Sequence, residues 1–492
     1  MTQINTALNT NHAWLAIAAG RLLDGGHELT DFYEPNPPLS ILLYVPAVLL
    51  SRLAGIPLYY TPYLVGFAAL LLSAWTIFLL LEKWPGRDRH QNTVFVFAYV
   101  LACTFLATNI YFAERDEFVV WGLVPFLIVQ MAITRNVPLP RALVWPVLIP
   151  GTAAILIKFH YGLFPVLLLL HRIMQRKNVL SVLRDADFLA LAGGTLVYAA
   201  VTIAFFPDYL STVFPDFMKF YLPVHSSFMG KNVVIGLGFA GAMAASAALF
   251  EFPAALLRTS LLCCAAAALA IGLFGLQGKG FYYHLIPAAV FFYCGMGTIL
   301  YGLAAKACRN QAAGTWTTAV ILTALAYHVA PLNTGFPTHD QYRALRLPRL
   351  AEEAGPGETF FAFSENMEMI FQASIYSGVA HASRFPGLWW LPGLEELQGA
   401  EHERKFKQYA GYVAEDLRRY KPRVMAIAVN LGANGKPGFD LIGYLDHEPA
   451  FRKEMRHYRK DGQMKDNRRD YFRGTTIDSD FPIVYDVYRR VL

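Results

Sequence analysis

The sequence contains few charged residues, few cysteines and none of the common nucleotide-binding motifs. Only 16% of its 492 residues are charged and 55% are hydrophobic, which excludes an ordinary soluble protein. The five cysteines show no zinc or redox spacing and none follows residue 308, so we expect neither such a site nor disulfides. No G-x-G-x-x-G or P-loop pattern occurs, and a net charge of +6 does not indicate a nucleic-acid partner. A polytopic membrane protein is the class that remains.

Apolar runs long enough to cross about 30 Å of hydrocarbon are abundant. The stretch from 143 to 174 is interrupted only at Lys158, Phe159 and His160, and we interpret it as two short spans that meet at a polar turn. The other predicted spans are 61–82, 91–112, 117–134, 187–206, 232–250, 254–276, 285–305 and 315–332. The expected fold is mainly α-helical, with about ten crossings in a core of residues 1–334.

The last part of the chain, residues 335–492, has a different composition. It carries more than half of the charged residues, which predicts a water-facing domain. Apolar runs at 359–363 and 424–429, and a weaker one near 483–487, predict strands, while 403–420 has helical periodicity. We therefore expect a small α/β domain after residue 334.

Lysine and arginine, which are retained on the cytoplasmic side of a membrane, predict the orientation of the core. Loops 83–90, 135–141, 171–186 and 306–314 are basic and are expected inside. The polar turns 114–117, 158–160 and 279–284, the aromatic loop 207–231 and the C-terminal domain then face outward. Loop 207–231 predicts either an interfacial aromatic belt or a gate over a cleft.

The N-terminal 54 residues do not fit the pattern of a spanning helix. Residues 12–24 predict a surface helix ended by Gly25-Gly26, and 38–54, interrupted by Pro38 and Pro46, an interfacial or re-entrant helix. Only about ten polar residues precede the first of these, so no signal peptide or first span is visible. We expect a misassigned start codon or the loss of a preceding helix.

Between these two helices lies an acidic loop, residues 24–39, in which Asp31 and Glu34 precede the rigid Asn36-Pro37-Pro38 turn. A carboxylate close to hydrocarbon is costly, so an acidic loop that leads into apolar sequence indicates a functional site. The alternative is a capped turn in which both carboxylates accept backbone N–H groups.

The order of these motifs resembles the GT-C superfamily of membrane glycosyltransferases, which includes protein O-mannosyltransferases and the aminoarabinose transferase of lipid A. The resemblance to an uncharacterised bacterial branch is carried by His12-Ala13-Trp14, Asp31-Phe32, Glu34 to Leu39, Arg115, Lys158 with His160, Lys279-Gly280, Tyr283-His284, Arg384-Phe385-Pro386 and Leu391-Pro392-Gly393. It covers most of the chain, and it implies a multi-pass protein of the bacterial cytoplasmic (inner) membrane with an extracytoplasmic active site and C-terminal domain.

The resemblance also implies an activity: inverting transfer of a sugar from a polyprenyl-phosphate carrier to an extracytoplasmic glycan, lipid or protein. That chemistry needs a base and cations that hold the leaving phosphate. The acidic residue that supplies the base in better-known members is replaced here by Asn11, and an amide cannot act as a base. We therefore expect Asp31 to be the base, with Glu34 as a second candidate or as a residue that orients the acceptor.

The remaining roles implied by the resemblance fall on the outward turns. Carrier-phosphate binding is expected of Arg115, Lys158, His160, Lys279, Tyr283 and His284. Glu114, Asp116 and Glu117 are expected to orient the carrier phosphate or to bind a divalent cation such as Mg²⁺ or Mn²⁺, and Arg384 to contribute to the acceptor side. The alternative for the turns is that their charged side chains reach toward water and lipid headgroups.

Two other classes of membrane protein share parts of this pattern. A transporter or flippase of a lipid-linked glycan typically places charges within spans and shows internal repeats, whereas the polar residues here lie at one face. A polysaccharide polymerase or ligase uses the same carrier but typically concentrates its cations in a large outer loop. Both remain alternatives to a glycosyltransferase.

Overall fold

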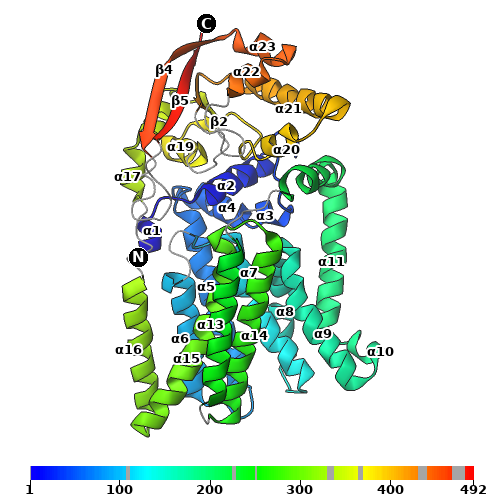
Figure 1. Ribbon diagram of the computed structural model, residues 1–492, viewed down its shortest axis with the longest axis vertical. Coiled ribbons are helices and arrows are strands. Elements are labelled where there is room, and N and C mark those ends of the chain that lie inside the picture. Colours follow the sequence, from blue (N-terminus) through cyan, green and yellow to red (C-terminus); the bar gives the residue numbers. More distant parts are fainter. Residues whose placement is uncertain are drawn as a thin grey trace. The chain divides into compact units, whose positions relative to one another are not determined.

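The computed structural model describes residues 2–106, 111–223, 229–249, 252–329, 337–363, 370–429, 440–467 and 482–491. The chain forms two compact units (Figure 1). Unit 1 consists of Met1–Pro62, Thr202–Val224 and Asn333–Leu492, and unit 2 of Tyr63–Val201 and His225–Leu332. The N-terminal 62 residues thus group with the C-terminal segment, whereas the sequence suggested a simple division at residue 334.

Unit 2 is a helical bundle. Every predicted span corresponds to a helix: α5 (Thr61–Glu82), α6 (Arg89–Leu101) continued by η1 (Ala102–Leu106), α7 (Arg115–Thr134), α8 (Arg141–Ile157), α9 (Leu163–Arg176), α11 (Ala186–Phe205), α13 (Met229–Leu249), α14 (Ala254–Gln277), α15 (Ile286–Cys308) and α16 (Gln311–Val329). The short helices α10 (Val179–Val182), η2 (Phe159–Gly162) and η5 (Tyr282–Leu285) complete it. Within the described residues, five of these helices are long and apolar enough to cross a membrane. The multi-pass helical fold is confirmed.

Helices α7 and α8 pack unusually closely because small residues face each other. A Cβ atom added to Gly122 would lie 2.4 Å from the Cβ of Ala154, and one added to Gly151 would lie 2.8 Å from Phe126. Small residues of this kind let membrane helices approach. The antiparallel pair brings the start of α7, at Arg115, to the end of α8, at Ile157, which is the break predicted before η2.

Unit 1 contains a five-stranded mixed sheet in the order β2-β1-β3-β5-β4. Strands β1 (Thr359–Phe363), β2 (Ala380–His381) and β3 (Val424–Ala428) are parallel, and β4 (Tyr458–Asn467) and β5 (Pro482–Arg490) are antiparallel additions. Its helices are α1 (Thr2–Asn5), α2 (Thr10–Leu23), α3 (Leu39–Leu42), α4 (Val45–Ala54), η3 (Tyr209–Val213), α12 (Phe214–Asp216), η4 (Phe217–Tyr221), α17 (His339–Arg343), α18 (Arg346–Glu352), α19 (Ile370–Ser377), α20 (Leu391–Glu395), α21 (Gly399–Tyr420), α22 (Leu441–Leu445) and α23 (Pro449–Met455). The predicted α/β domain is confirmed.

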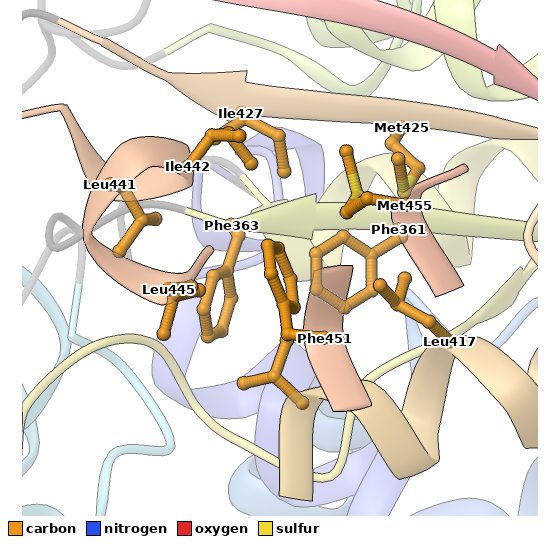
Figure 2. A pocket seen from close by; sticks show the side chains of 11 residues that line it. Phe361, Phe363, Leu417, Met425, Ile427, Leu441, Ile442, Leu445, Phe451 and Met455 are labelled. Carbon is orange, nitrogen blue, oxygen red and sulfur yellow. The ribbon is translucent and has the colours of Figure 1, made fainter. Parts of the chain in front are cut away.

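One face of this sheet is closed by α21, α22 and α23 over a dry core. Figure 2 shows Phe361 and Phe363 of β1 pointing toward Leu445 and Phe451, with Met425 and Ile427 of β3 beside them. The remaining void is about 10 Å³, which is at most the space of one water molecule. This part of the domain is packed for stability.

Helix α2 is the predicted helix at residues 12–24. The Asn9 side chain accepts a hydrogen bond from the Asn11 N–H at its start, and Gly25, with φ of 82°, follows its C-cap residue Asp24. The helix is more enclosed than a surface helix would be, because most of its residues are buried, among them His12 and Trp14. The reason is tertiary packing, since α4 and α19 both contact α2.

Candidate functional site

The acidic loop is folded back on itself within unit 1. Leu29 has φ of 66°, and Glu28 and Phe32 form a short backbone bridge. The Asp31 carboxylate accepts hydrogen bonds from the His27 N–H, at 2.8 Å, and from the Thr30 hydroxyl, at 3.0 Å. The predicted alternative of a capped turn therefore describes the geometry around Asp31.

Asp31 also forms an ion pair with Arg419 of α21, with 2.5 Å between Oδ1 and Nη2. Partial burial works to raise the pKa of Asp31, but the hydrogen bonds from His27, Thr30 and Arg419 outweigh it and lower the pKa below its ordinary value. The side chain is 14% exposed. Asp31 is therefore an ionised and partly exposed carboxylate.

Glu34 is enclosed, with 2% of the residue exposed. Its Oε2 accepts a 2.5 Å hydrogen bond from the Trp14 indole of α2, and its Oε1 accepts from the Asn36 backbone N–H at 2.9 Å and from the Asn36 side chain. Through the Glu34 carboxylate, these bonds connect two of the motifs noted in the sequence. One motif is His12-Ala13-Trp14 and the other is the segment of residues 34–39.

A third carboxyl, Glu28, was not predicted from the sequence. It is 5% exposed, and its Oε2 is buried without a hydrogen-bond partner among the described residues. Burial, reinforced by the nearby charges of Glu34 and Asp208, raises the pKa of Glu28 to about 9. Nothing in the local sequence marks this residue, because only the fold of the loop brings it beside Glu34.

Three arginines hold the loop by its backbone carbonyl groups. Arg21 of α2 donates to the carbonyls of Asp31, at 2.6 Å, and of Ser383, at 2.7 Å. Arg419 donates to the Thr30 carbonyl at 3.0 Å, and Arg384 to the Leu29 carbonyl. Arginine, with five donors, suits such multiple contacts.

Arg384 is 1% exposed, and its hydrogen bonds and ion pairs are with other residues of unit 1. It pairs with Asp416 and Glu415 of α21, each at 2.8 Å, and its own backbone carbonyl accepts from the Tyr33 N–H at 2.6 Å. These contacts fix the acidic loop against α21. The acceptor-side role expected of Arg384 stays a prediction.

The described part of loop 207–231 is anchored in unit 1 by Asp216. Its carboxylate accepts from the hydroxyls of Tyr33, at 3.0 Å, and Tyr409, at 2.9 Å, and from Lys405 Nζ at 2.6 Å. Residues 224–228 of this loop lie outside the described residues. The gate interpretation stays a prediction.

A second polar region lies in unit 2, and we call it the polar cluster. It comprises the carboxylates Glu114, Asp116 and Glu117 and the residues Arg115, Lys158, His160, Lys279, Tyr283 and His284. The Asp116 side chain is fully buried and accepts from Lys158 Nζ at 2.6 Å and from the Tyr161 hydroxyl at 3.0 Å. The close packing of α7 and α8 brings Asp116 and Lys158 together.

The cationic and imidazole groups gather around this ion pair. Lys158 Nζ lies 5.3 Å from the centroid of the Tyr283 ring, and His160 forms a 2.8 Å hydrogen bond with Gln277 of α14. His284 is within electrostatic range of Lys158, His160, Arg115 and Lys279. All six predicted phosphate-binding residues are therefore in one region of unit 2.

Lys279 lies in a turn that depends on glycine. Gly278 and Gly280 have φ of 68° and 71°, a backbone conformation that L side chains rarely adopt. Partial burial lowers the pKa of Lys279 to about 8.

The start of α7 holds the other charged residues of the polar cluster. Arg115 lies 3.7 Å from the Glu114 carboxylate, and the Glu117 carboxylate accepts a hydrogen bond from the Ala113 N–H at 2.7 Å.

The carboxylates of the polar cluster do not form a ready cation site. Within the described residues, no three His, Cys, Asp or Glu side chains are grouped to hold a metal ion. Both oxygens of Asp116 are occupied by Lys158 and Tyr161. The expected Mg²⁺ or Mn²⁺ stays a prediction.

Comparison with known proteins gives a likeness in structure only. No protein-family model and no curated protein matches the sequence. The solved structure of ArnT from Cupriavidus metallidurans bound to undecaprenyl phosphate superposes with a TM-score of 0.50, at 14% identity, over 87% of this chain and 90% of that one. The apo form of that ArnT gives a TM-score of 0.36 at 12% identity, with the same coverage. ArnT is a GT-C aminoarabinose transferase, so the GT-C-like fold expected from the sequence is confirmed.

Proposed function

We propose that this protein is an integral-membrane glycosyltransferase that moves a sugar, with inversion, from a polyprenyl-phosphate carrier to an extracytoplasmic acceptor. The observation that carries the proposal is the polar cluster, which gathers Lys158, Lys279, Arg115 and two histidines in a bundle with the fold of ArnT. The ArnT structure is described as bound to undecaprenyl phosphate, a ligand of the class that such a cluster would hold.

In the proposed reaction an acceptor hydroxyl attacks the anomeric carbon as the bond from that carbon to the phosphate oxygen breaks. The acceptor proton passes to a carboxylate, and the leaving polyprenyl phosphate is held by cations of the polar cluster. Asp31 is the preferred base because it is ionised and its side chain is 14% exposed, whereas the Glu34 residue is only 2% exposed. Glu34 then positions Trp14 and the Asn36 turn.

The orientation proposed from the charge pattern puts both regions on the outer side of the bacterial cytoplasmic membrane. The basic loops at 83–90, 135–141, 171–186 and 306–314 support it, because cations are retained inside. The C-terminal domain is then extracytoplasmic, and the acceptor is a glycan, lipid or protein of the cell envelope.

The test is transfer from radiolabelled polyprenyl-phosphate sugars by the purified full-length protein, with Asp31→Asn and Glu34→Gln variants beside it. We expect Asp31→Asn to lose at least 100-fold in rate, within the range of general-base catalysis. Full activity in Asp31→Asn with loss in Glu34→Gln would assign the base to Glu34. Full activity in both variants would exclude Asp31 and Glu34 as the base. If the wild-type protein were inactive with every carrier tested, the transporter and polymerase alternatives would be favoured.

The phosphate-binding role needs a variant that separates function from folding. Lys158→Met alone leaves the buried Asp116 carboxylate uncompensated and should destabilise the bundle. The double variant Asp116→Asn/Lys158→Met removes both charges, so it should recover stability while transfer and polyprenyl-phosphate binding stay low. Recovery of transfer in the double variant would show that Lys158 serves only to neutralise Asp116.

A further inference from the structure

A cavity of about 610 Å³ lies inside unit 2, within the size range of ligand sites. Its walls are apolar and come from α5, α6, α7, α9, α14 and α15, with Phe95, Phe164 and Phe291 among the lining side chains. Along α7 it extends from Val124 to Arg135, and along α14 from Ala254 to Leu269. The eleven helical steps from Val124 to Arg135 correspond to about 16 Å along the α7 wall.

Three arginines line the same cavity, and all three are at one end of it. Arg87 follows α5, Arg135 is the C-cap residue of α7 and Arg258 is in the second turn of α14. Across the described residues none of these guanidinium groups forms an ion pair with a carboxylate. The site is therefore amphipathic, with an apolar interior and a cationic mouth.

The guanidinium of Arg87 is held but not saturated. Nε donates to Asn92 and Nη1 to Thr259, at 2.8 and 2.6 Å, while Nη2 is buried and has no acceptor among the described residues. Arg87 and Arg135 also stack over Phe95 and Trp84, at 5.9 and 5.8 Å. These contacts hold two cations at the mouth, and Nη2 of Arg87 remains without an acceptor among the described residues.

The mouth is at the opposite end of α7 from the polar cluster. Helix α7 has 20 residues between Arg115 and Thr134, which is about 30 Å of helix and close to the thickness of a hydrocarbon core. The basic loops 83–90 and 135–141, which are expected on the cytoplasmic side, both contribute to the mouth.

We propose that this cavity binds an anionic glycerophospholipid of the cytoplasmic leaflet, with the phosphodiester on the three arginines and an acyl chain between α7 and α14. Basic pockets between membrane helices on the cytoplasmic side bind anionic headgroups. The apolar walls exclude a free phosphate or nucleotide as the natural occupant, because such ligands offer nothing to cover them. This site is independent of the proposed sugar transfer.

Titration of the purified full-length protein with phosphatidylglycerol, followed by native mass spectrometry, tests the proposal. Phosphatidylethanolamine with the same acyl chains is the comparison lipid. We expect preferential binding of the anionic lipid, and at least a tenfold loss of affinity in Arg135→Gln/Arg258→Gln. Lys83→Gln/Arg141→Gln removes two exposed cations from the same loops but not from the cavity lining, and should bind as the wild type does.

A second variant separates the cavity from a general charge effect. Ala266→Phe fills the apolar interior and leaves every arginine in place, so it should also lose the lipid. Equal binding of both lipids, unchanged binding in both cavity variants, or preferential binding of polyprenyl phosphate at this site would overturn the proposal. Thermal unfolding without lipid checks that each variant is folded.

Discussion

The acidic loop of unit 1 and the polar cluster of unit 2 both hold buried charge, but they neutralise it in different ways. In the loop, arginines from α2, α21 and the segment after β2 bind backbone carbonyls, and many of these contacts join residues more than 350 positions apart. In the cluster, the ion pair of Asp116 with Lys158 joins two consecutive helices. The loop therefore depends on the C-terminal domain for its shape, whereas the cluster depends on helix packing within the bundle.

The largest effect should come from breaking the loop at Arg384. Arg384→Met leaves Asp416, which is itself fully buried, without its partner and frees the Leu29 carbonyl, at an expected cost of about 3–5 kcal/mol. Thermal unfolding of the purified protein measures it, and Arg384→Met/Asp416→Asn should recover part of the loss. An unchanged unfolding temperature in the single variant would mean that the loop does not need this clamp.

The pH dependence of stability should distinguish the loop from the cluster through Glu28. Its pKa is raised to about 9 in the folded protein, so the folded state keeps a proton that the unfolded chain releases near pH 4.5. This contribution is complete below pH 4.5 and is lost as pH rises toward 9, by at most about 1.4 kcal/mol per pH unit.

Glu28→Gln removes that titration. Unfolding temperatures measured from pH 5 to 9 should show the wild type losing stability relative to Glu28→Gln as pH rises. Parallel curves would mean that Glu28 is ionised and solvated in the folded protein.

A smaller change should follow from Gly393→Ala, in the Leu391-Pro392-Gly393 motif of α20. The added Cβ would lie 2.7 Å from the Phe220 backbone of η4, so the segment that anchors Asp216 must shift, at a cost of about 1–3 kcal/mol. Gly411→Ala in α21 is the matched control, since an added Cβ there meets nothing within 4 Å. Equal stability of the two variants would contradict the close packing of α20 on η4.

The smallest effect on stability, but an informative one on activity, is expected for Arg419→Gln. Its ion pair with Asp31 is half exposed and should contribute about 0–1 kcal/mol. Loss of the cation raises the pKa of Asp31, so the acid limb of the pH–rate profile should move to higher pH if Asp31 is the base. Arg418→Gln, the neighbouring exposed cation, should leave the profile in place, and a similar shift in both variants would exclude a specific role for the pair.

Much of the fold could be predicted from the sequence because the strongest signals are local. Apolar length located the helices of unit 2, of which five in the described part of the chain are long and apolar enough to cross a membrane, and the break at Lys158 was visible as a polar interruption. In unit 1 the apolar strands β1 and β3 were also visible, but β4, with its Lys and Asp residues, reads as an exposed segment and becomes a strand only by pairing with β5.

The candidate site was predicted in part. Residues of the polar cluster were identified because charges between apolar runs are conspicuous. The roles of Arg21, Arg419 and Glu28 were not predicted, because they depend on contacts between distant residues. Arg21 and Ser383, for example, are 362 residues apart. Arg384 was singled out for an acceptor role, and its internal partners became apparent only once α21 was placed beside the loop.

The assembly of unit 1 from three separate segments has a consequence for synthesis of the protein. Arg21 and its carbonyl partner in Ser383 are separated by 362 positions, so at about 5–20 residues per second the segment after β2 is made roughly 20–70 s after Arg21. Until α21 is made, Asp31 lacks its ion pair with Arg419. A chain interrupted before α21 would lack a formed acidic loop even though every helix of unit 2 had been made. The acidic loop therefore forms only late in synthesis, after α21 has been added.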